Sequence, residues 1–335
     1  MIDLEQVFAK KRRGNSIIVD NTDEIDFRPF AFVLNVKELV NTDSVAIAPG
    51  CTLRKAYKTE TEYIKEFLKE NGPRYGTATW EDKPVASGKV SKFPKKLWRY
   101  FVIEFENDDP NLDLLEAALA VAPSSLDIGF AKIKVNVEGV IRPACLYHAP
   151  SLYQSLSGLY LANTGRDKLL LSVGNAEGSQ ISHVFSLIAK HDHGILELTR
   201  IGELLLDLKD LPHFSPLQIL GYFAILESVL THQPRPDDRY ESLTRQITNK
   251  LALLNKRWNP SFDYRPLGGA THEKIWPQMY AYRSAIAHGN KLDFKTKLAL
   301  LKNADVANAL IIDAVKKTIR QAYVEPRLVK DLHDV

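Results

Sequence analysis

The sequence predicts an α+β protein, in which an N-terminal mixed α/β domain with an antiparallel-rich sheet is followed by an all-α helical bundle. Short apolar runs rich in β-branched residues, typical of buried strands, predominate in the N-terminal part. Apolar residues spaced three or four positions apart, typical of helices, predominate in the C-terminal part. We therefore expect a mixed domain, a helical connecting region, a bundle and a frayed tail, at 1–150, 151–210, 211–325 and 326–335.

Composition narrows the class of protein. The chain has 335 residues, of which 45% are hydrophobic and 25% charged, as in soluble proteins of two domains. Cys51 and Cys145 form neither a disulfide framework nor a metal-ligand spacing, which favours a reducing compartment. The N-terminus lacks the apolar segment of a signal peptide, and no apolar run approaches the roughly 20 residues that span a bilayer. We expect a cytoplasmic protein with no membrane partner.

The N-terminal domain is expected to combine strands with two helices. Thr59 and Glu62 have the spacing of a capping box and predict the start of a helix, which Gly72 and Pro73 end. Residues 128–141 alternate between apolar and polar side chains, which predicts a half-exposed strand. The other expected elements are strands at 16–20, 31–36 and 98–106 and a short apolar helix at 111–121.

No catalytic motif stands out in this domain. It has no glycine-rich phosphate loop, no Gly-x-Ser-x-Gly elbow and no paired Cys-x-x-Cys. Further along the chain, His191, Asp192 and His193 offer metal-ligating side chains in a row. Because no other histidine or cysteine follows at helical spacing, a polar loop is the favoured interpretation. We predict no metal and no cofactor.

The C-terminal part reads as a series of helices. A helical stripe is expected at 152–160, and glycines at 165, 174 and 178 are expected to break the chain that follows it. The helix at 216–232 is apolar almost all round and should be buried on most sides. Glu227 lies inside it, and a carboxylate there must be paired or face a cleft or an interface. Further helices are expected at 237–258, 277–288, 293–302 and 305–323, with an exposed loop at 259–271.

The helix that stops at Gly289 organises the functional interpretation. Pro277 suits its first turn, and Gly289 suits the positive φ that ends many helices. Arg283 and His288 are five positions apart, which is roughly 140° around the axis. Both can face one cleft only if it wraps the helix end or if a second chain completes it, as at a two-fold dimer axis. A structural interpretation stands beside this one, because the helix dipole favours a histidine in the last turn.

Charge is distributed unevenly along the chain. Residues 231–335 carry 18 Lys and Arg against 11 Asp and Glu, a net of +7. The whole chain carries 44 against 41, so the remainder has 26 against 30, a net of −4. A basic C-terminal third fits a phosphate-bearing partner as well as ordinary solvated helix faces.

The arrangement of these helices resembles the HEPN superfamily. Residues 282–289 match its Arg-x(4–6)-His signature, with Ser284 directly after Arg283, and residues 223–228 match an early helix with an acidic residue. The layout is similar to the ApeA-like HEPN group of prokaryotic defence and abortive-infection proteins, in which a mixed α/β region precedes the helices. Residues 52–56, followed by Glu60, Glu62 and Ile64, are similar to a segment of those N-terminal regions.

The resemblance implies a metal-independent endoribonuclease that cuts RNA, with tRNA as a candidate substrate, in an anti-phage defence or toxin context. His288 would act as general acid or base, and Arg283 would hold the phosphate. Ser284 would donate a hydrogen bond, and Glu227 would orient one of the other two. Tyr282, Asn290 and Lys291 beside the motif are expected to bind RNA, with core packing the alternative for the tyrosine.

The resemblance also implies a homodimer through the bundle, with a phage-derived trigger or an antitoxin as a further partner. The N-terminal domain would then be a sensor or regulatory domain. An alternative keeps the helices as a non-catalytic dimerisation or nucleotide-binding module, since one fold hosts both kinds of protein. In that alternative the N-terminal domain carries ligand or partner recognition.

Overall fold

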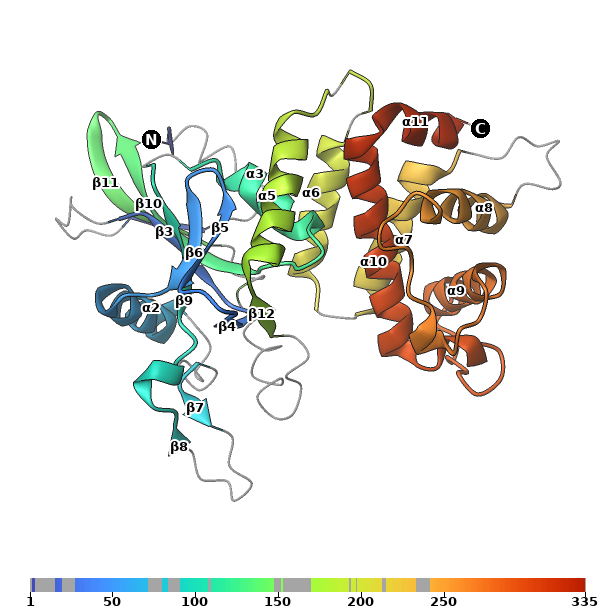
Figure 1. The fold of residues 1–335 in the computed structure, drawn as a ribbon, viewed down its shortest axis with the longest axis horizontal. Coiled ribbons are helices and arrows are strands. Elements are labelled where there is room, and N and C mark those ends of the chain that lie inside the picture. The colour runs from blue at the N-terminus through green and yellow to red at the C-terminus, as the bar shows by residue number, and fades with distance from the viewer. Residues whose placement is uncertain are drawn as a thin grey trace. The chain divides into compact units, whose positions relative to one another are not determined.

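The structure is a computed structural model in which the chain forms two compact units, Met1–Ser186 and Leu187–Val335 (Figure 1). It describes residues 2–3, 16–19, 28–71, 80–83, 91–107, 110–147, 152, 170–192, 194–196, 198–212, 215–232 and 242–334. The chain thus divides after Ser186, whereas the sequence predicted a connecting region over 151–210. Within the described residues, no helix is both long and apolar enough to cross a bilayer.

The first unit is built on an eight-stranded sheet, in which every strand but one is antiparallel to its neighbours. The strands run in the order β2-β11-β10-β3-β9-β6-β5, and β1 pairs with β10 in parallel. Their bounds are β1 Ile2–Asp3, β2 Ser16–Val19, β3 Phe30–Val33, β5 Ser44–Ala48, β6 Cys51–Lys55, β9 Phe101–Phe105, β10 Ile128–Val137 and β11 Val140–Tyr147. Two short pairs lie outside it, β4 Val36–Leu39 with β12 Leu171–Val173, and β7 Asp82–Lys83 with β8 Ser91–Lys92. The predicted antiparallel-rich sheet is confirmed.

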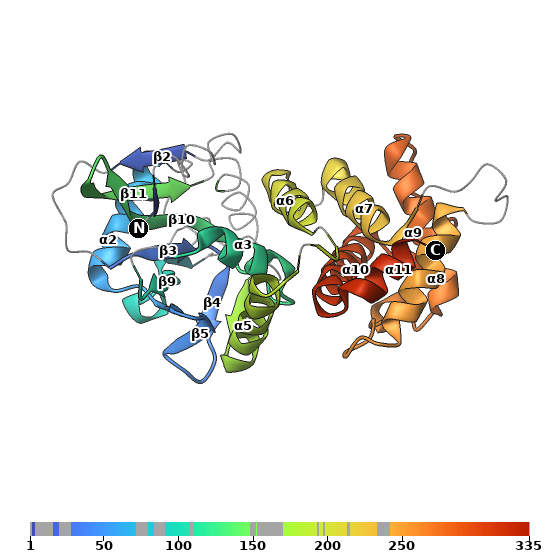
Figure 2. The same cartoon turned by 90° about the horizontal axis from the view of Figure 1, so that it is seen from above.

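Helices cover both faces of this sheet (Figures 1 and 2). Alternate residues of β3 enter different cores, because successive side chains of a strand point to opposite faces. Ala31 and Val33 join the core beneath α3 (Leu112–Val121) and α5 (Asn175–Ala189). Phe30 and Phe32 join the core beneath α2 (Lys58–Asn71).

The structure corrects two predictions from the strand pattern. The apolar run at 31–36 is two strands, β3 and β4, rather than one. Residues 128–141 are not one half-exposed strand, because the chain turns at Glu138 and Gly139, both at positive φ. Lys132, expected on an exposed face, is 4% exposed, and its Nζ lies 3.8 Å from the centroid of the Tyr63 ring.

The start of α2 differs from the predicted capping box. The Glu60 carboxylate accepts a hydrogen bond from the Tyr57 amide at 2.7 Å. This is only the glutamate half of a capping box, and it lies two residues before the pair predicted from sequence. Glu60 is 8% exposed because it also pairs with Arg54, whose Nη1 and Nη2 donate to its two oxygens at 2.8 and 2.7 Å. The Arg54 Nε donates to Glu104 at 2.6 Å. These residues of the proposed N-terminal similarity segment therefore join α2 to the sheet.

Gly178 is part of α5 and not a helix break. A Cβ there would lie 2.3 Å from Val45 Cγ1 and 2.7 Å from the Ala46 carbonyl oxygen, so only glycine allows the helix this close to β5. Gly178→Ala is therefore expected to destabilise the protein by about 1–3 kcal/mol. Gly202→Ala, at a helix position with open space, should stabilise it by up to about 1 kcal/mol. Urea unfolding followed by circular dichroism, with the two units fitted separately, checks the opposite signs.

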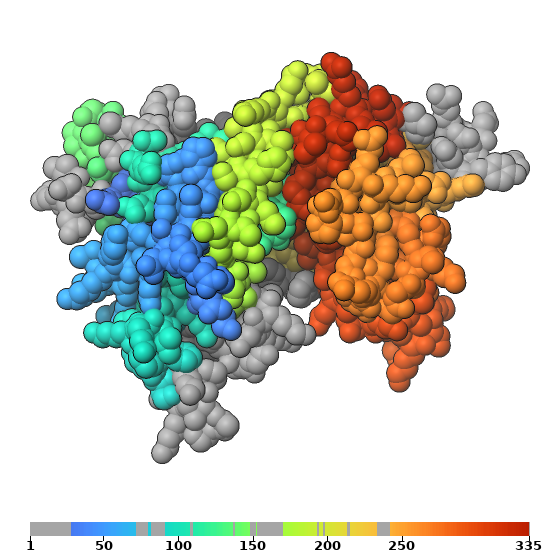
Figure 3. Space-filling model, in the orientation of Figure 1, coloured from blue at the N-terminus to red at the C-terminus, as the bar shows by residue number. Residues whose placement is uncertain are grey.

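The second unit is helical. Its helix α7 (Pro216–Leu230) contacts α6, α8, α9, α10 and α11, which confirms that it is buried on most sides. Figure 3 shows α8, α9 and α10 reaching the surface of this unit in orange and red. The other bounds are α6 Thr199–Asp207, η4 Leu208–Asp210, α8 Leu243–Asn255, η5 Arg265–Leu267, α9 His272–Ala287, η6 Ala299–Leu301, α10 Ala304–Val324 and α11 Pro326–Asp334.

Three helix predictions in this unit differ from the structure. Helix α9 begins five residues before Pro277, at His272, so the proline lies inside the helix and not at its first turn. The helix expected at 293–302 is confined to the short turn η6. The tail expected to fray forms α11, whose Val329 is fully buried. Residues 233–241 lie outside the described residues, as does the predicted start of the helix at 237.

A buried histidine joins α8 to α9. His272 Nε2 lies 2.8 Å from the Thr248 carbonyl oxygen, and its Nδ1 lies 2.6 Å from the Tyr264 hydroxyl. A neutral ring satisfies both contacts, donating at Nε2 and accepting at Nδ1. Burial lowers the pKa of His272, although the Thr248 carbonyl and the charge of Glu273 oppose this.

Because His272 is buried, we expect the free energy of unfolding to decrease in mild acid. Below the ordinary histidine pKa of about 6.5, the unfolded chain takes up a proton that the folded chain refuses. The free energy of unfolding should therefore fall as the pH drops from about 7 towards the lower folded pKa. Urea titrations across this range check the slope. His272→Gln should remove this part of the slope, and an unchanged slope would contradict the assignment.

Candidate functional site

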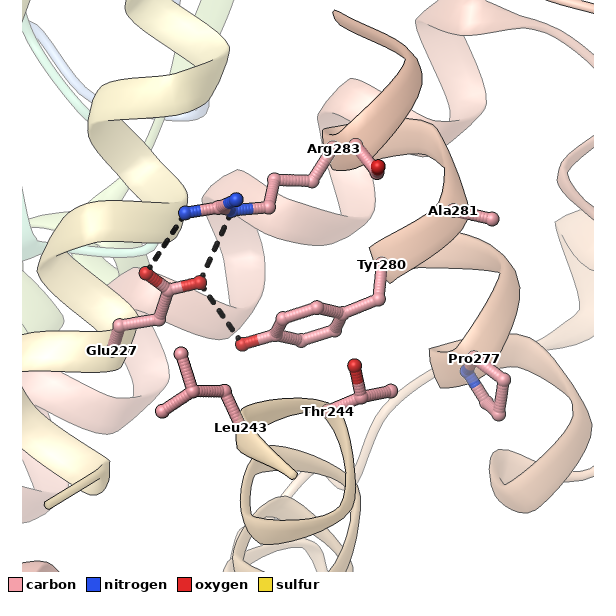
Figure 4. A pocket seen from close by; sticks show the side chains of 8 residues that line it. Glu227, Leu243, Thr244, Pro277, Tyr280, Ala281 and Arg283 are labelled. Atoms are coloured by element: carbon pink, nitrogen blue, oxygen red, sulfur yellow. Dashed lines mark hydrogen bonds and ion pairs between the residues drawn. The ribbon is translucent and has the colours of Figure 1, made fainter. Parts of the chain in front are cut away.

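A pocket of about 410 Å³ opens between α7, α8 and α9. Helix α7 supplies Glu227, and the first turn of α8 supplies Leu243 and Thr244 (Figure 4). The remaining lining residues all belong to α9, and they are Pro277, Tyr280, Ala281, Arg283 and Ser284. Three of the four predicted catalytic residues, Glu227, Arg283 and Ser284, thus meet in one pocket although 56 residues separate the first two.

Glu227 and Arg283 form an ion pair across the pocket (Figure 4). Arg283 Nη2 donates to Glu227 Oε2 at 3.2 Å, and Arg283 Nε lies 3.2 Å from Oε1 without the alignment of a hydrogen bond. The side chains are 36% and 17% exposed for Arg283 and Glu227, so the pair is partly screened by water. Arg283 Nη1 has no partner among the described residues. One edge of the guanidinium therefore holds the carboxylate while Nη1 stays available to a ligand.

Tyr280 holds the same carboxylate from below in Figure 4. Its hydroxyl donates to Glu227 Oε1 at 3.2 Å, and its ring packs edge-on against Phe223 with centroids 5.8 Å apart. Burial raises the pKa of Tyr280, and the neighbouring carboxylate raises it further. The phenol therefore stays protonated and acts as a hydrogen-bond donor to Glu227. Glu227 was predicted to orient Arg283 or His288, and this geometry is consistent with the first alternative.

The end of α9 follows the predicted glycine stop. Gly289 has φ +64°, its amide donates to the Ile286 carbonyl at 3.1 Å, and the Asn290 amide donates to the Ala285 carbonyl at 2.8 Å. This pair of bonds is a Schellman motif, which satisfies carbonyls left without helical partners. His288 is the capping residue, and its side chain is exposed.

His288 does not line the pocket, but it continues one side of it. Pro277, Ala281, Ser284 and His288 are spaced by four, three and four residues, and such positions form a ridge along one helix face. The first three line the pocket, so His288 lies one turn beyond its end. We call these four residues the α9 ridge. Within a single chain the pocket brings Arg283 and Ser284 together and leaves His288 outside.

The predicted RNA-binding residues have different positions. Tyr282 is 2% exposed, its hydroxyl donates to Asn308 Oδ1 at 2.8 Å, and its ring packs against Phe294. A ring held in the core cannot stack on a base, so the prediction for Tyr282 is wrong and the packing alternative holds. Asn290 and Lys291 are exposed at the end of α9.

The sequence motif of His191 to His193 is described only in part, since His193 lies outside the described residues. His191 Nε2 lies 2.7 Å from the Leu196 carbonyl oxygen, and its ring packs edge-on against Tyr323. Among the described residues, no group of three or more metal-ligating side chains comes together.

Five lining residues were not predicted from the sequence as part of the site, and they are Leu243, Thr244, Pro277, Tyr280 and Ala281. Leu243 and Thr244 enter the pocket because α8 begins at Ser242, whose side chain caps the helix. The Ser242 to Arg245 spacing is a sequence signal for that start. Tyr280 is three residues before Arg283 and therefore on a neighbouring position of the helix surface, which is the sequence signal that could have found it.

Comparison with known proteins identifies no relative of this chain. No protein-family model, no curated protein and no solved structure matches the chain. The HEPN resemblance therefore stays a prediction, and its support comes from the residues and contacts above.

Proposed function

We propose that the chain is a HEPN-type, metal-independent endoribonuclease whose site is built on Glu227, Arg283, Ser284 and His288. The observation that carries the proposal is the ion pair between Glu227 and Arg283, two residues singled out from sequence and joined across the pocket. A non-catalytic dimerisation module does not require an arginine that keeps Nη1 available beside a pocket. A phosphate-binding site does, because guanidinium groups bind phosphate oxygens through two parallel hydrogen bonds.

The proposed reaction is transesterification within the RNA. The ribose 2′-oxygen attacks the adjacent phosphorus, and His288 takes the proton from that hydroxyl. As the new bond to phosphorus forms, the bond from phosphorus to the 5′-oxygen breaks, and the leaving oxygen takes a proton from a general acid. The products are a 2′,3′-cyclic phosphate and a 5′-hydroxyl. Arg283 and Ser284 stabilise the charge that develops on the phosphate oxygens.

The position of His288 favours a composite site. It lies on the exposed end of α9, one turn beyond the pocket of its own chain. In a two-fold dimer through α9, the same surface of each copy would meet its partner. His288 of one chain would then stand beside the phosphate held by Arg283 of the partner subunit. We therefore propose a homodimer as the active form.

A specific observation also favours the alternative of a non-catalytic dimerisation or nucleotide-binding module. Glu227 already occupies one edge of Arg283, and this reduces the positive charge that a phosphate would meet. In this alternative the pocket would bind a nucleotide without cleaving it, and the first unit would recognise a ligand or partner. Cleavage assays separate the two functions.

The deciding experiment is cleavage of total RNA by the purified full chain in EDTA. The proposal expects fragments with 5′-hydroxyl ends, and no cleavage of an RNA in which every ribose carries a 2′-O-methyl group. Cleavage that EDTA abolishes would overturn metal independence. Binding of nucleotides without any cleavage, in a protein shown to be dimeric, would support the alternative.

The defence or toxin context needs a cellular test. Expression of the wild-type chain in bacteria is expected to arrest growth, alone or after phage infection, while His288→Ala is expected to be tolerated. Fragments of one tRNA in the arrested cells would assign the substrate. Equal growth arrest by both chains would contradict a role for the nuclease.

A further inference from the structure

The chain from α9 to α10 is a basic segment of residues 291–302, which we call the lysine segment. It contains four lysines and one acidic residue. The lysines are Lys291, Lys295, Lys297 and Lys302, all of them exposed. None of the four has an ion-pair partner among the described residues. The acidic residue, Asp293, accepts hydrogen bonds from the Lys295 and Thr296 amides at 2.9 and 3.0 Å, so it folds the turn.

The lysine segment is fixed on the protein by its other residues. Leu298 and Leu301 are 3% and 0% exposed, so they anchor its second half in the core. The Phe294 ring packs against Tyr282 of α9 with centroids 5.9 Å apart. The Leu300 amide donates to the Gln278 side chain at 3.0 Å. Apolar residues therefore face inward while the lysines face water, and the charges are presented from a fixed backbone.

These anchors place the lysine segment along one flank of α9. At about 100° per residue, Gln278 and Tyr282 lie on one side of the α9 ridge, and Arg283 lies on the other. The ridge between them carries no formal charge other than that of a protonated His288, and its side chains are small except for the histidine. A polyanion crossing the ridge at His288 would meet cations on both sides.

We propose that the lysine segment is a phosphate-binding surface that holds the RNA strand on one side of the scissile phosphate. The inference rests on the proposed function, because it takes RNA as the ligand. Unpaired lysines on a fixed segment suit phosphates, since each contact releases counterions without first breaking an ion pair. Lysines act as point charges, so this surface contributes affinity and register and no base preference.

The test uses the full chain and an RNA oligonucleotide with 2′-O-methyl riboses, which binds but cannot be cleaved by the proposed reaction. Fluorescence anisotropy gives the affinity over a series of salt concentrations. The triple variant is Lys295→Gln, Lys297→Gln, Lys302→Gln. On single strands each phosphate contact contributes about 0.7 to the slope of log affinity against log salt. Loss of three contacts should therefore reduce the magnitude of this slope by about 2. The matched control neutralises Lys37, Lys69 and Lys330, three exposed lysines elsewhere. It should keep the wild-type slope.

The outcomes separate this inference from the proposed function. A wild-type slope in the triple variant would overturn the inference, even if RNA is cleaved through His288. A reduced slope in the triple variant, together with cleavage that does not depend on His288, would support the surface and overturn the proposed nuclease site. Displacement of the RNA by oligoaspartate at lower concentrations than by unlabelled RNA would assign the surface to an acidic protein and overturn the inference.

Discussion

Replacing His288 with alanine is expected to lower the rate of RNA cleavage by about 10²–10⁴-fold, the usual contribution of a positioned general acid or base. Its side chain is exposed at the end of α9, and only its backbone takes part in the helix cap. The variant should therefore fold like the wild type. Single-turnover cleavage of one defined RNA in EDTA measures the effect.

Two controls make the His288 prediction specific. His183→Ala changes another exposed histidine, which belongs to α5 in the first unit, and should leave the rate unchanged. The wild-type rate should also depend on pH, since general acid–base catalysis requires the catalytic group in one protonation state. Equal rates for wild type and His288→Ala would show that the α9 motif is not the catalytic centre.

The sequence predicted that Glu227 must be paired or face a cleft or an interface, and the family resemblance left Arg283 and His288 as the residues it would orient. A carboxylate inside an apolar helix is costly unless it is paired, so Glu227 required a cation or a cleft, and it has both. Gly289 was predictable for a similar reason, since its positive φ is costly for residues with a side chain. Features that depend on the chemistry of one residue and its helix can therefore be predicted from the sequence.

Other features depended on contacts that no local pattern contains. Tyr282 is next to Arg283 in sequence, but one residue turns a helix by about 100°, which points the tyrosine into the core. Lys132 alternates like an exposed residue, yet α2 covers that face of the sheet and the Tyr63 ring receives its amine. Gly178 was taken for a helix break because nothing in the sequence shows how closely α5 approaches β5.

Substituting Arg283 with lysine is expected to lower cleavage by about 10²–10³-fold, the range measured when one donor to a developing oxyanion is lost. Lysine keeps the positive charge but presents a single ammonium, so it cannot hold Glu227 on one edge and a phosphate on the other. Arg283→Lys therefore tests the geometry of the fork rather than the charge alone. Near-wild-type activity would mean that charge at this position suffices.

The role of Glu227 can be tested by a double-mutant cycle with Arg283, in which the cleavage rates of the single and double variants are compared. If Glu227 acts only by positioning the guanidinium, Glu227→Gln should slow the proposed cleavage by the otherwise wild-type chain but have no further effect in the Arg283→Ala background. If Glu227 were itself the base, the two effects would add. Tyr280→Phe supplies the third measurement, because it removes one donor to the same carboxylate and leaves the ring against Phe223. A smaller loss that disappears in the Arg283→Ala background would place Tyr280, Glu227 and Arg283 in one chain of contacts ending at the phosphate.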